Sequence, residues 1–446
     1  MVGLTIVFWA SCLLPVQAAD ATEWASFRGP NGSGLGTGSP PVKWNIETGE
    51  NVKWKTPIPG LAHSSPIVWG DRVFVTTAVS LASEPQLSTG WLHGSGDSDP
   101  ESGEWEWKVL CLDRKTGRML WEKTAHRGEP KTKRHPKSTH ANSTPASDGK
   151  NVVALFGSEG LHCYDLDGQL RWKKDLGTLD AGPVGYPDMQ WGFAGSPILR
   201  DGKVIVQCDV RNTSFWAAFD AADGRELLRV PRNDDPTWCT PSVHSGKDVT
   251  QLICNGYKRI AGYNLATGDE LWHLQGGGDV PVPRPIVAGD LFVLTAGHGK
   301  SPIYGVKADA RGDLTPTDDA KPAGLAWWHK VHGSYMPTPI VVADLVFVAN
   351  DNGILTALEL ATGAKVFRER LPGSAASTYS ASPVAADGRI YVTSESGQVD
   401  VIRAAREFEV LASNQMGETC MASPAISDGL LLIRGKSNLY ALGTEQ

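Results

Sequence analysis

A short phrase recurs along most of the chain and constrains its fold more than any other feature. A serine or threonine precedes a proline, and a short apolar run follows. The proline stands at Pro66, Pro145, Pro197, Pro241, Pro339, Pro383 and Pro424, with a variant at Pro285. Successive prolines are 79, 52, 44, 44, 54, 44 and 41 residues apart. A period near 44 with three longer intervals indicates one structural unit that recurs and carries insertions.

A second phrase ends each unit with a tight turn and an aromatic residue. It reads KTGRMLW up to Trp121, DGQLRW up to Trp172, ATGDELW up to Trp272 and, more degraded, AGLAWW up to Trp328. The last opening phrase, at Pro424, has no closing phrase after it, whereas ETGENVKW, up to Trp54, precedes the first opening phrase. This offset is what a ring closed by its N-terminal strand requires.

Each unit has room for four short strands. In the sixth unit they read TPIVV, LVFVAN, LTALEL and KVFRE, separated by polar or glycine-containing breaks. Four strands in a period of ~40–50 residues are typical of a β-propeller blade. We predict an all-β fold, an eight-bladed β-propeller of four-stranded blades over residues 43–446. The strand near residues 52–55 should complete the last blade and so remove a free sheet edge.

The closing phrase resembles the tryptophan-docking motif of the pyrroloquinoline quinone (PQQ) repeat, A-x-D-x-x-T-G-x-x-x-W. It stands here as CLDRKTGRMLW and GYNLATGDELW, with ALELATGAKVF as a variant. In that family the tryptophan packs between neighbouring blades. The resemblance therefore implies a blade-docking role for Trp54, Trp121, Trp172, Trp272 and Trp328. A WD40 propeller is excluded because no Gly-His and Trp-Asp pairing recurs.

The resemblance implies two classes of function. Quinoprotein alcohol dehydrogenases of this family use PQQ, calcium, a catalytic aspartate and usually a disulfide between adjacent cysteines. This chain has no adjacent cysteines and no CxxCH haem-attachment sequence, and it is shorter than those enzymes. It is more similar to exported bacterial PQQ-repeat proteins of unassigned function that open with W-x-x-F-R-G-P, as residues 24–30 do here. We expect a ligand-binding or protein-interaction scaffold; the alternative is a PQQ-dependent oxidoreductase acting on alcohols or aldose sugars.

Residues 1–18, MVGLTIVFWASCLLPVQA, are typical of a secretory signal peptide. We expect export to the periplasm or the exterior, with a lead-in segment at residues 19–42. No later apolar run is long enough to span a bilayer. A net charge of −7 argues against a nucleic-acid partner. We expect a monomer that binds a protein or a small molecule, with its cysteines buried as free thiols rather than paired.

Strand directions alternate within a blade, so two kinds of loop share one face: those joining strands two and three, and those joining blades. Insertions at residues 80–106, 125–140 and 176–193 fall in such loops, whereas residues 309–324 extend the opposite face. The first insertion has six carboxylates and no lysine or arginine, and the second is strongly basic. Either separate cation and anion sites or mutual neutralisation would explain this contrast.

Polar and aromatic residues gather just before the opening prolines, where each inner strand starts from that same face. They are His63, His140, Asn142, Trp191, Asp235, Trp238, Asp279, His332, Tyr335, Tyr379 and Glu418. Such a ring suits a planar or polar ligand at the axis; a water-filled channel is the alternative. Arg284, which replaces the serine or threonine of the fifth unit, could bind a carboxylate or phosphate or pair with Asp279 or Asp235.

No metal site is predicted. His63 and His140 could share a metal only if blade geometry brings them together, and the carboxylates at Asp97, Asp99 and Glu101 lack EF-hand spacing. The glycine-rich stretch at residues 24–36 precedes no helix, so it is not a phosphate loop. We expect its Trp24 and Phe27 to pack on the propeller and its Arg28 to pair with a surface carboxylate.

Overall fold

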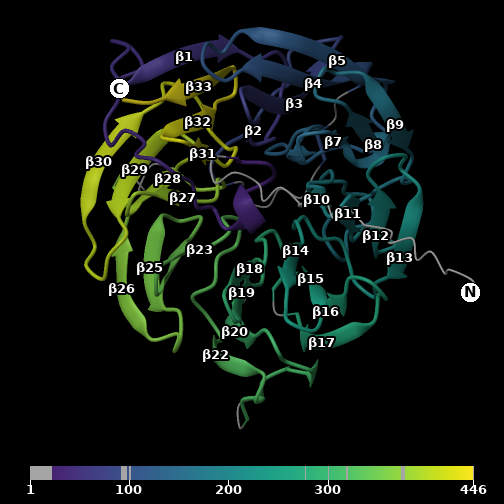
Figure 1. The fold of residues 1–446 in the computed structure, drawn as a ribbon, viewed down its shortest axis with the longest axis vertical. Coiled ribbons are helices and arrows are strands. Elements are labelled where there is room, and N and C mark those ends of the chain that lie inside the picture. Colours follow the sequence, from purple (N-terminus) through teal and green to yellow (C-terminus); the bar gives the residue numbers. More distant parts are fainter. Residues whose placement is uncertain are drawn as a thin grey trace, which may run out of the picture.

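The computed structural model describes residues 23–91, 98–99, 102–276, 278–299, 301–317, 320–372 and 377–444. Their strands form eight sheets arranged as blades around one axis (Figure 1), each built on four antiparallel strands, with a short fifth strand added to one of them. This architecture confirms the predicted eight-bladed β-propeller. The predicted signal peptide, residues 1–18, lies outside the described residues.

Seven blades use strands that follow one another in the chain, from the axis to the outer rim (Figure 1). Blade 1 has β2 (Ile67–Trp69), β3 (Arg72–Ser80), β4 (Trp105–Asp113) and β5 (Met119–Gly128). Blade 2 has β6 (Ala146–Ser147), β7 (Val152–Leu155), β8 (Leu161–Tyr164) and β9 (Leu170–Lys174). Blade 3 has β10 (Ile198–Arg200), β11 (Lys203–Cys208), β12 (Phe215–Asp220) and β13 (Glu226–Pro231). Blade 4 has β14 (Ser242–Ser245), β15 (Thr250–Cys254), β16 (Arg259–Asn264) and β17 (Glu270–Gln275).

Blade 5 has β18 (Ile286–Ala288), β19 (Leu291–Thr295), β20 (Ile303–Lys307) and β22 (Leu325–His329). Blade 6 has β23 (Ile340–Val342), β24 (Leu345–Ala349), β25 (Ile354–Glu359) and β26 (Lys365–Arg370). Blade 7 has β27 (Val384–Ala386), β28 (Arg389–Thr393), β29 (Gln398–Arg403) and β30 (Val410–Gln415). The insertion of blade 5 supplies β21 (Gly312–Asp313), which pairs with β17 as a fifth strand of blade 4. Two 3-10 turns complete the elements, η1 (Pro30–Gly32) and η2 (Gly157–Glu159).

Blade 8 joins the two ends of the chain. Its three inner strands are β31 (Ala425–Ser427), β32 (Leu430–Arg434) and β33 (Asn438–Leu442), and its outer strand is β1 (Val52–Pro57). β1 pairs antiparallel with β33, so that Trp54 lies opposite Ala441. The N-terminal strand therefore closes the ring, as the offset between the two sequence phrases predicted.

Neighbouring blades stack face to face, which explains the burial pattern of their strands. All residues of β8 and β24 are buried, because both faces of a middle strand contact other blades. The outer strand β1 instead alternates between exposed and more buried residues, because only one of its faces is covered. The hydrophobic core thus lies between the blades.

Tryptophans of the closing phrase join each blade to the next. The indole Nε1 of Trp54 donates to Arg114 O at 2.8 Å, that of Trp121 to Leu166 O at 2.9 Å, and that of Trp172 to Ala221 O at 2.9 Å. Each indole also lies under a turn glycine of the following blade, where an added Cβ would be under 3 Å from the ring. These three residues have the docking role that the resemblance implied.

Two predicted docking tryptophans differ from this pattern. In blade 5 the docking residue is Trp327, whose Nε1 donates to Leu360 O at 2.7 Å, so the prediction of Trp328 was wrong by one residue. Trp328 stacks on Tyr304 within its own blade. Trp272 reaches blade 5 by stacking on Phe292, but its Nε1 donates to a side chain of its own blade.

Residues 24–37, here called the axial plug, cross the axis at the centre of the ring (Figure 1). Trp24 forms an antiparallel bridge with Val68 in blade 1, and Leu35 forms a parallel bridge with Ala385 in blade 7. Further hydrogen bonds join the plug to blades 2, 3, 5, 6 and 8, and η1 packs on the first strand of blade 4. The backbone partners of the plug lie within innermost strands, as Val68 and Ala385 do, or just after one, as Gly429 does, so the plug lies on the side of the ring away from the loops that precede these strands.

The side chain of Arg28 holds this plug, but not in the predicted way. It is 1% exposed and donates to Pro339 O and Pro383 O, both at 2.9 Å, and to two carbonyls of the plug itself. Burial, with the nearby positive charge of Arg284, lowers the pKa of Arg28 to about 9. The expected pairing with a surface carboxylate was wrong, because the glycines around Arg28 let it turn inward. Trp24 packs on the propeller as expected and is fully buried.

Candidate functional site

The serines and threonines of the opening phrase form a ring of hydrogen bonds around the axis. In six pairs of neighbouring blades, the backbone N–H of one opening residue donates to the hydroxyl of the next, at 2.9–3.0 Å. Ser65 donates in this way to Thr144, and Thr338 donates to Ser382. The recurring hydroxyl therefore ties adjacent innermost strands together. The proline after it has no backbone N–H, so no further donor at this position needs a partner.

Arg284 replaces the hydroxyl residue of blade 5, so it interrupts this ring, and its side chain binds the axial plug. Its Nη1 donates to Phe27 O at 2.6 Å and its Nε to Ser242 Oγ at 2.9 Å. It is 3% exposed, and burial lowers its pKa to about 10. Among the described residues, the guanidinium forms neither of the predicted pairs with Asp279 and Asp235, and it does not line the axial cavity. Arg284 anchors Phe27, which forms part of the cavity floor.

Above the plug lies an axial cavity of about 410 Å³. Its walls come from loops between blades and from loops between second and third strands, which share one face as the topology predicted. Phe27 and the ring hydroxyls lie at its base. With the plug across the opposite face, the cavity is a funnel entered from the insertion-bearing side.

Six predicted site residues line this cavity. They are His63, Asn142, Trp191, Trp238, Tyr335 and Tyr379. They come from blades 1, 2, 3, 4, 6 and 7, or from the loops that lead into them, so the structure brings together residues up to 316 positions apart. Their shared position just before an opening proline explains why they converge.

The other predicted residues have structural contacts elsewhere. His140 packs against Trp105 and Trp107, and His332 packs against His329. Asp235 pairs with Lys258 at 2.8 Å. Asp279 forms a backbone bridge with His298, and Glu418 accepts hydrogen bonds from Asn438 and Tyr440. The prediction that these five residues and Arg284 line the cavity was wrong. The loops before the inner strands follow different paths, so several of their side chains point away from the axis.

Two tryptophans form an aromatic wall. The rings of Trp191 and Trp238 lie 5.7 Å apart with their planes inclined by 38°. The Nε1 of Trp238 donates to Gly192 O at 2.7 Å and its backbone N–H to Pro281 O at 2.9 Å. The backbone N–H of Trp191 donates to Ala181 O at 2.7 Å. The ring of Trp191 also packs edge-on against His135 at 5.1 Å, so the two indoles, here called the tryptophan pair, are held in place before any ligand arrives.

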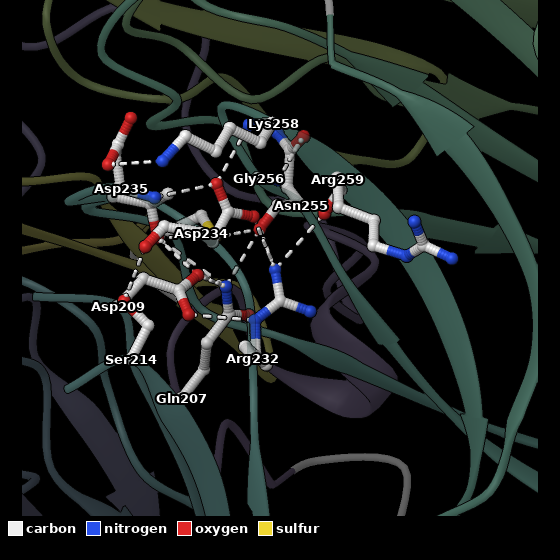
Figure 2. A network of polar contacts seen from close by, with 12 residues as sticks. Gln207, Asp209, Ser214, Arg232, Asp234, Asp235, Asn255, Gly256, Lys258 and Arg259 are labelled. Atoms are coloured by element: carbon white, nitrogen blue, oxygen red, sulfur yellow. Dashed lines mark hydrogen bonds and ion pairs between the residues drawn. The ribbon is translucent and has the colours of Figure 1, made fainter. Parts of the chain in front are cut away.

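A buried ionic network holds the loop that carries Trp238 (Figure 2). Arg232 contacts Asp209 at 2.7 Å and Asp234 at 2.9 Å, and all three side chains are at most 1% exposed. Thr237, next to Trp238, donates from its hydroxyl to Asp209 at 3.0 Å. Burial raises the pKa of Asp234 to about 6, although Arg232 opposes the shift. Because its polar groups bond one another, this network positions Trp238 and offers no open site of its own.

A charged pair closes one side of the cavity. Lys137 Nζ lies 2.8 Å from Glu395 Oε1, although the two residues belong to the second insertion and to blade 7. Glu395 also accepts from Ser380 Oγ and from the backbone N–H of Gly90. Burial alone would raise the pKa of Glu395, but the charge and hydrogen bond of Lys137 lower it. Lysine and carboxylate therefore neutralise each other.

Further titratable groups line the cavity, among them His63, His298 and Asp351. The His63 Nε2–H donates to Lys137 O at 2.8 Å, and burial lowers the pKa of His63 to about 4, so it is neutral at pH 7. Asp351 has a pKa raised by burial. The ring of His298 lies edge-on to Tyr335 at 5.0 Å. Apart from the Lys137–Glu395 pair, Asp351 is the carboxylate of the described lining.

The three insertions of this face interlock around the cavity mouth. Arg134 pairs with Asp99 at 3.0 Å and donates to Gln86 O, and Arg127 pairs with Glu104 at 2.9 Å. The backbone N–H of His135 donates to the third insertion at Trp191 O. Two carboxylates of the acidic insertion, Asp99 and Glu104, are thus paired with arginines of the basic insertion, which favours mutual neutralisation, one of the two explanations left open.

The sequence did not lead to Lys137, Asp351, Thr378 or Glu395, although all four line the cavity. Asp351 and Glu395 follow the second strands of blades 6 and 7 by two residues. These loops share the face of the loops between blades, so the topology itself was the signal that could have identified them. Lys137 was visible only as part of a basic insertion.

Metal ligands do not cluster in the part of the chain that the structure describes: no three His, Cys, Asp or Glu side chains lie close enough to hold an ion. His63 lines the cavity but His140 does not, so they form no shared site. Asp97 and Glu101 lie outside the described residues. The six described cysteines are buried free thiols. No described helix is long and apolar enough to cross a bilayer.

A ring of eight four-stranded blades with tryptophan docking and an axial funnel defines a PQQ-type β-propeller. The chain belongs to the PQQ-repeat family: the family model described as Outer membrane protein assembly factor BamB matches residues 106–369, more than half of the chain. No curated protein matches the sequence.

Solved structures show the same fold at low sequence identity. BamB from Moraxella catarrhalis is 14% identical, with 83% of this chain and 98% of that chain covered and a TM-score of 0.53. A europium-containing methanol dehydrogenase is 11% identical, with 94% and 91% covered and a TM-score of 0.63. Quinohemoprotein alcohol dehydrogenase from Comamonas testosteroni is 11% identical, with 97% and 82% covered and a TM-score of 0.62. At these identities the likeness extends to the fold alone.

Proposed function

We propose that the protein is an exported binding protein that takes a small molecule into its axial funnel. The observation that carries this proposal is the funnel itself, with a floor formed by Phe27 and a wall formed by the tryptophan pair. A concave, largely apolar site with a few convergent polar groups is typical of small-molecule binding. Export rests on residues 1–18.

The residues present do not fit PQQ with calcium. PQQ is a planar tricarboxylate, so its site needs cationic or strong hydrogen-bond donors, and calcium needs several oxygen ligands. Among the described lining residues, the lysine is Lys137 and the carboxylates are Asp351 and Glu395. Lys137 and Glu395 already bind each other. The oxidoreductase alternative is therefore the less favoured one.

A binding assay on the purified protein tests this function. Thermal shift with a mixed library of small molecules, followed by calorimetry on each hit, should find a ligand whose binding is lost in Trp238→Ala. PQQ with calcium forms a separate arm, read by thermal shift and by dye-linked oxidation of alcohols and aldose sugars. Saturable PQQ binding with turnover would favour the oxidoreductase. Failure of every small molecule to bind would instead favour a protein-interaction scaffold.

A further inference from the structure

We infer that the ligand of the axial funnel is a neutral saccharide, bound with a ring face against the tryptophan pair and its hydroxyls on the polar groups of the cavity. The inference rests on the proposed function and narrows it to one class of ligand. Three independent features of the lining support this inference. They are an aromatic surface that is held in place, buried hydroxyls that lack partners, and a lysine whose charge is paired with a carboxylate.

Fixed aromatic surface suits the apolar face of a sugar ring. The face of an indole carries partial negative charge, and the C–H bonds on one side of a pyranose point partial positive charge towards it. Trp191 and Trp238 are inclined by 38°, so together they form an angled surface rather than a slot for one flat molecule. The cavity of about 410 Å³ is large enough for a mono- or disaccharide.

Two buried hydroxyls of the lining find no partner among the described residues. They are Thr378 Oγ1 and Ser65 Oγ, on residues that are 4% and 1% exposed. A buried polar group without a partner is costly, and a hydroxyl needs a partner that can donate or accept. Sugar hydroxyls do both. An apolar aromatic ligand would fill the space and leave these groups unsatisfied.

The balance of charge favours a neutral ligand. The Lys137 ammonium is engaged by Glu395 at 2.8 Å, so no lining lysine remains for an anion in the described part of the wall. His63 is held neutral by burial. Asp351 is the remaining lining carboxylate, and a carboxylate accepts hydrogen bonds from neighbouring hydroxyls of one sugar. Burial raises the pKa of Asp351.

Saturation-transfer NMR and calorimetry with the full chain test this inference. The panel contains glucose, galactose, mannose, maltose, sucrose and trehalose as neutral sugars. Glucuronate is the acidic probe, glucosamine the cationic probe, and PQQ with calcium the aromatic anion. At least one neutral sugar should bind saturably, with its ring protons receiving saturation, and glucuronate and glucosamine should bind more weakly.

Two variants probe the contacts, each with a control. Trp238→Ala should weaken sugar binding roughly tenfold or more, and Trp328→Ala, on the outer strand of blade 5, should leave it unchanged. Thr378→Val preserves the shape of the side chain and should weaken sugar binding roughly fivefold. Its control, Thr267→Val at an exposed turn, should leave sugar binding unchanged. Because Thr378→Val removes a buried hydroxyl that lacks a partner, it should fold normally even if Trp238→Ala does not.

The outcomes separate the two proposals. If an acid, an amine or an aromatic molecule binds in a Trp238-dependent way and no neutral sugar does, the saccharide inference is wrong and the binding function stands. If no probe and no library molecule binds, both fail. Sugar binding that neither Trp238→Ala nor Thr378→Val weakens would place the sugar outside the funnel and overturn the inference.

Discussion

Removal of the Arg28 side chain should loosen the axial plug and destabilise the whole ring. The guanidinium donates to Pro339 O and Pro383 O at 2.9 Å each, and to Gly32 O and Ser33 O at 3.3 Å each. These bonds join blades 6 and 7 to the segment that also contacts the other six blades. Loss of Arg28 therefore affects the axis rather than one local contact.

The magnitude follows from two opposing effects. A bond from a charged donor contributes roughly 1.5–3 kcal/mol, and leaving a buried carbonyl without a donor costs about 1–3 kcal/mol. Against this, burying a guanidinium beside carbonyls instead of a carboxylate is itself costly, as its lowered pKa of about 9 shows. Counting the two short bonds fully and the two long ones little, Arg28→Ala should lower the free energy of unfolding by roughly 2–5 kcal/mol.

Urea unfolding followed by tryptophan fluorescence measures this change, and the 16 tryptophans provide a strong signal. Arg127→Ala is the matched control, because its guanidinium pairs with Glu104 at the surface with 57% of the side chain exposed. The control should leave the midpoint unchanged. Arg28→Lys should be intermediate, because one ammonium keeps the charge but lacks the planar fork. A loss below about 1 kcal/mol in Arg28→Ala would refute the plug as a structural element.

Three further predictions concern docking, pH and closure. Gly117→Ala places a Cβ 2.6 Å from the Trp54 ring at φ +69°, so it should cost roughly 1–3 kcal/mol more in urea unfolding than Gly49→Ala, which has φ +81° and open space; equal losses would contradict the docking role. Burial lowers the pKa of His162 to about 4, so its contribution to stability is full above pH 6.5 and is lost as the pH falls towards 4. Unfolding at pH 7 and pH 5 should therefore show about 2 kcal/mol less acid destabilisation in His162→Phe than in the parent, and parallel losses would argue against this. Deletion of residues 43–56 should leave β33 unpaired and cause aggregation in size-exclusion chromatography, whereas a stable monomer would contradict N-terminal closure.

The repeat made the fold predictable because each of its residues has a local role that the sequence displays. In six blades the hydroxyl of the serine or threonine before the proline accepts a hydrogen bond from the neighbouring innermost strand. The glycine of the closing turn leaves room for the preceding tryptophan. Each signal is weak alone, but it recurs in most blades and so becomes recognisable. The closing phrase that precedes the first unit, and is missing after the last, predicts that the N-terminal strand closes the ring. Trp328 was mistaken for Trp327 because two adjacent aromatics satisfy the same phrase equally well.

The sequence predicted only half of the site, because a residue lines the funnel only if it lies near the axis and its side chain also points towards it. Trp238 and Tyr335 face the cavity from the expected loops, but Asp235 turns to Lys258 at 2.8 Å. Glu395 and Asp351 enter from loops between second and third strands, where no recurring phrase marks them. Each loop has its own length and partners, so its side chains follow contacts that no repeat records.

By itself, the sequence determined the number of blades, the order of their strands and the closure of the ring, because these depend on contacts repeated at a regular spacing. Only the tertiary structure decided that the stretch around Arg28 closes the axis, that Arg284 supports it and that Lys137 meets Glu395 across the mouth. The last two residues are 258 positions apart, and each of these contacts occurs once. A contact that occurs once leaves no pattern along the chain, and it forms only when the closed ring brings distant loops to the same axis.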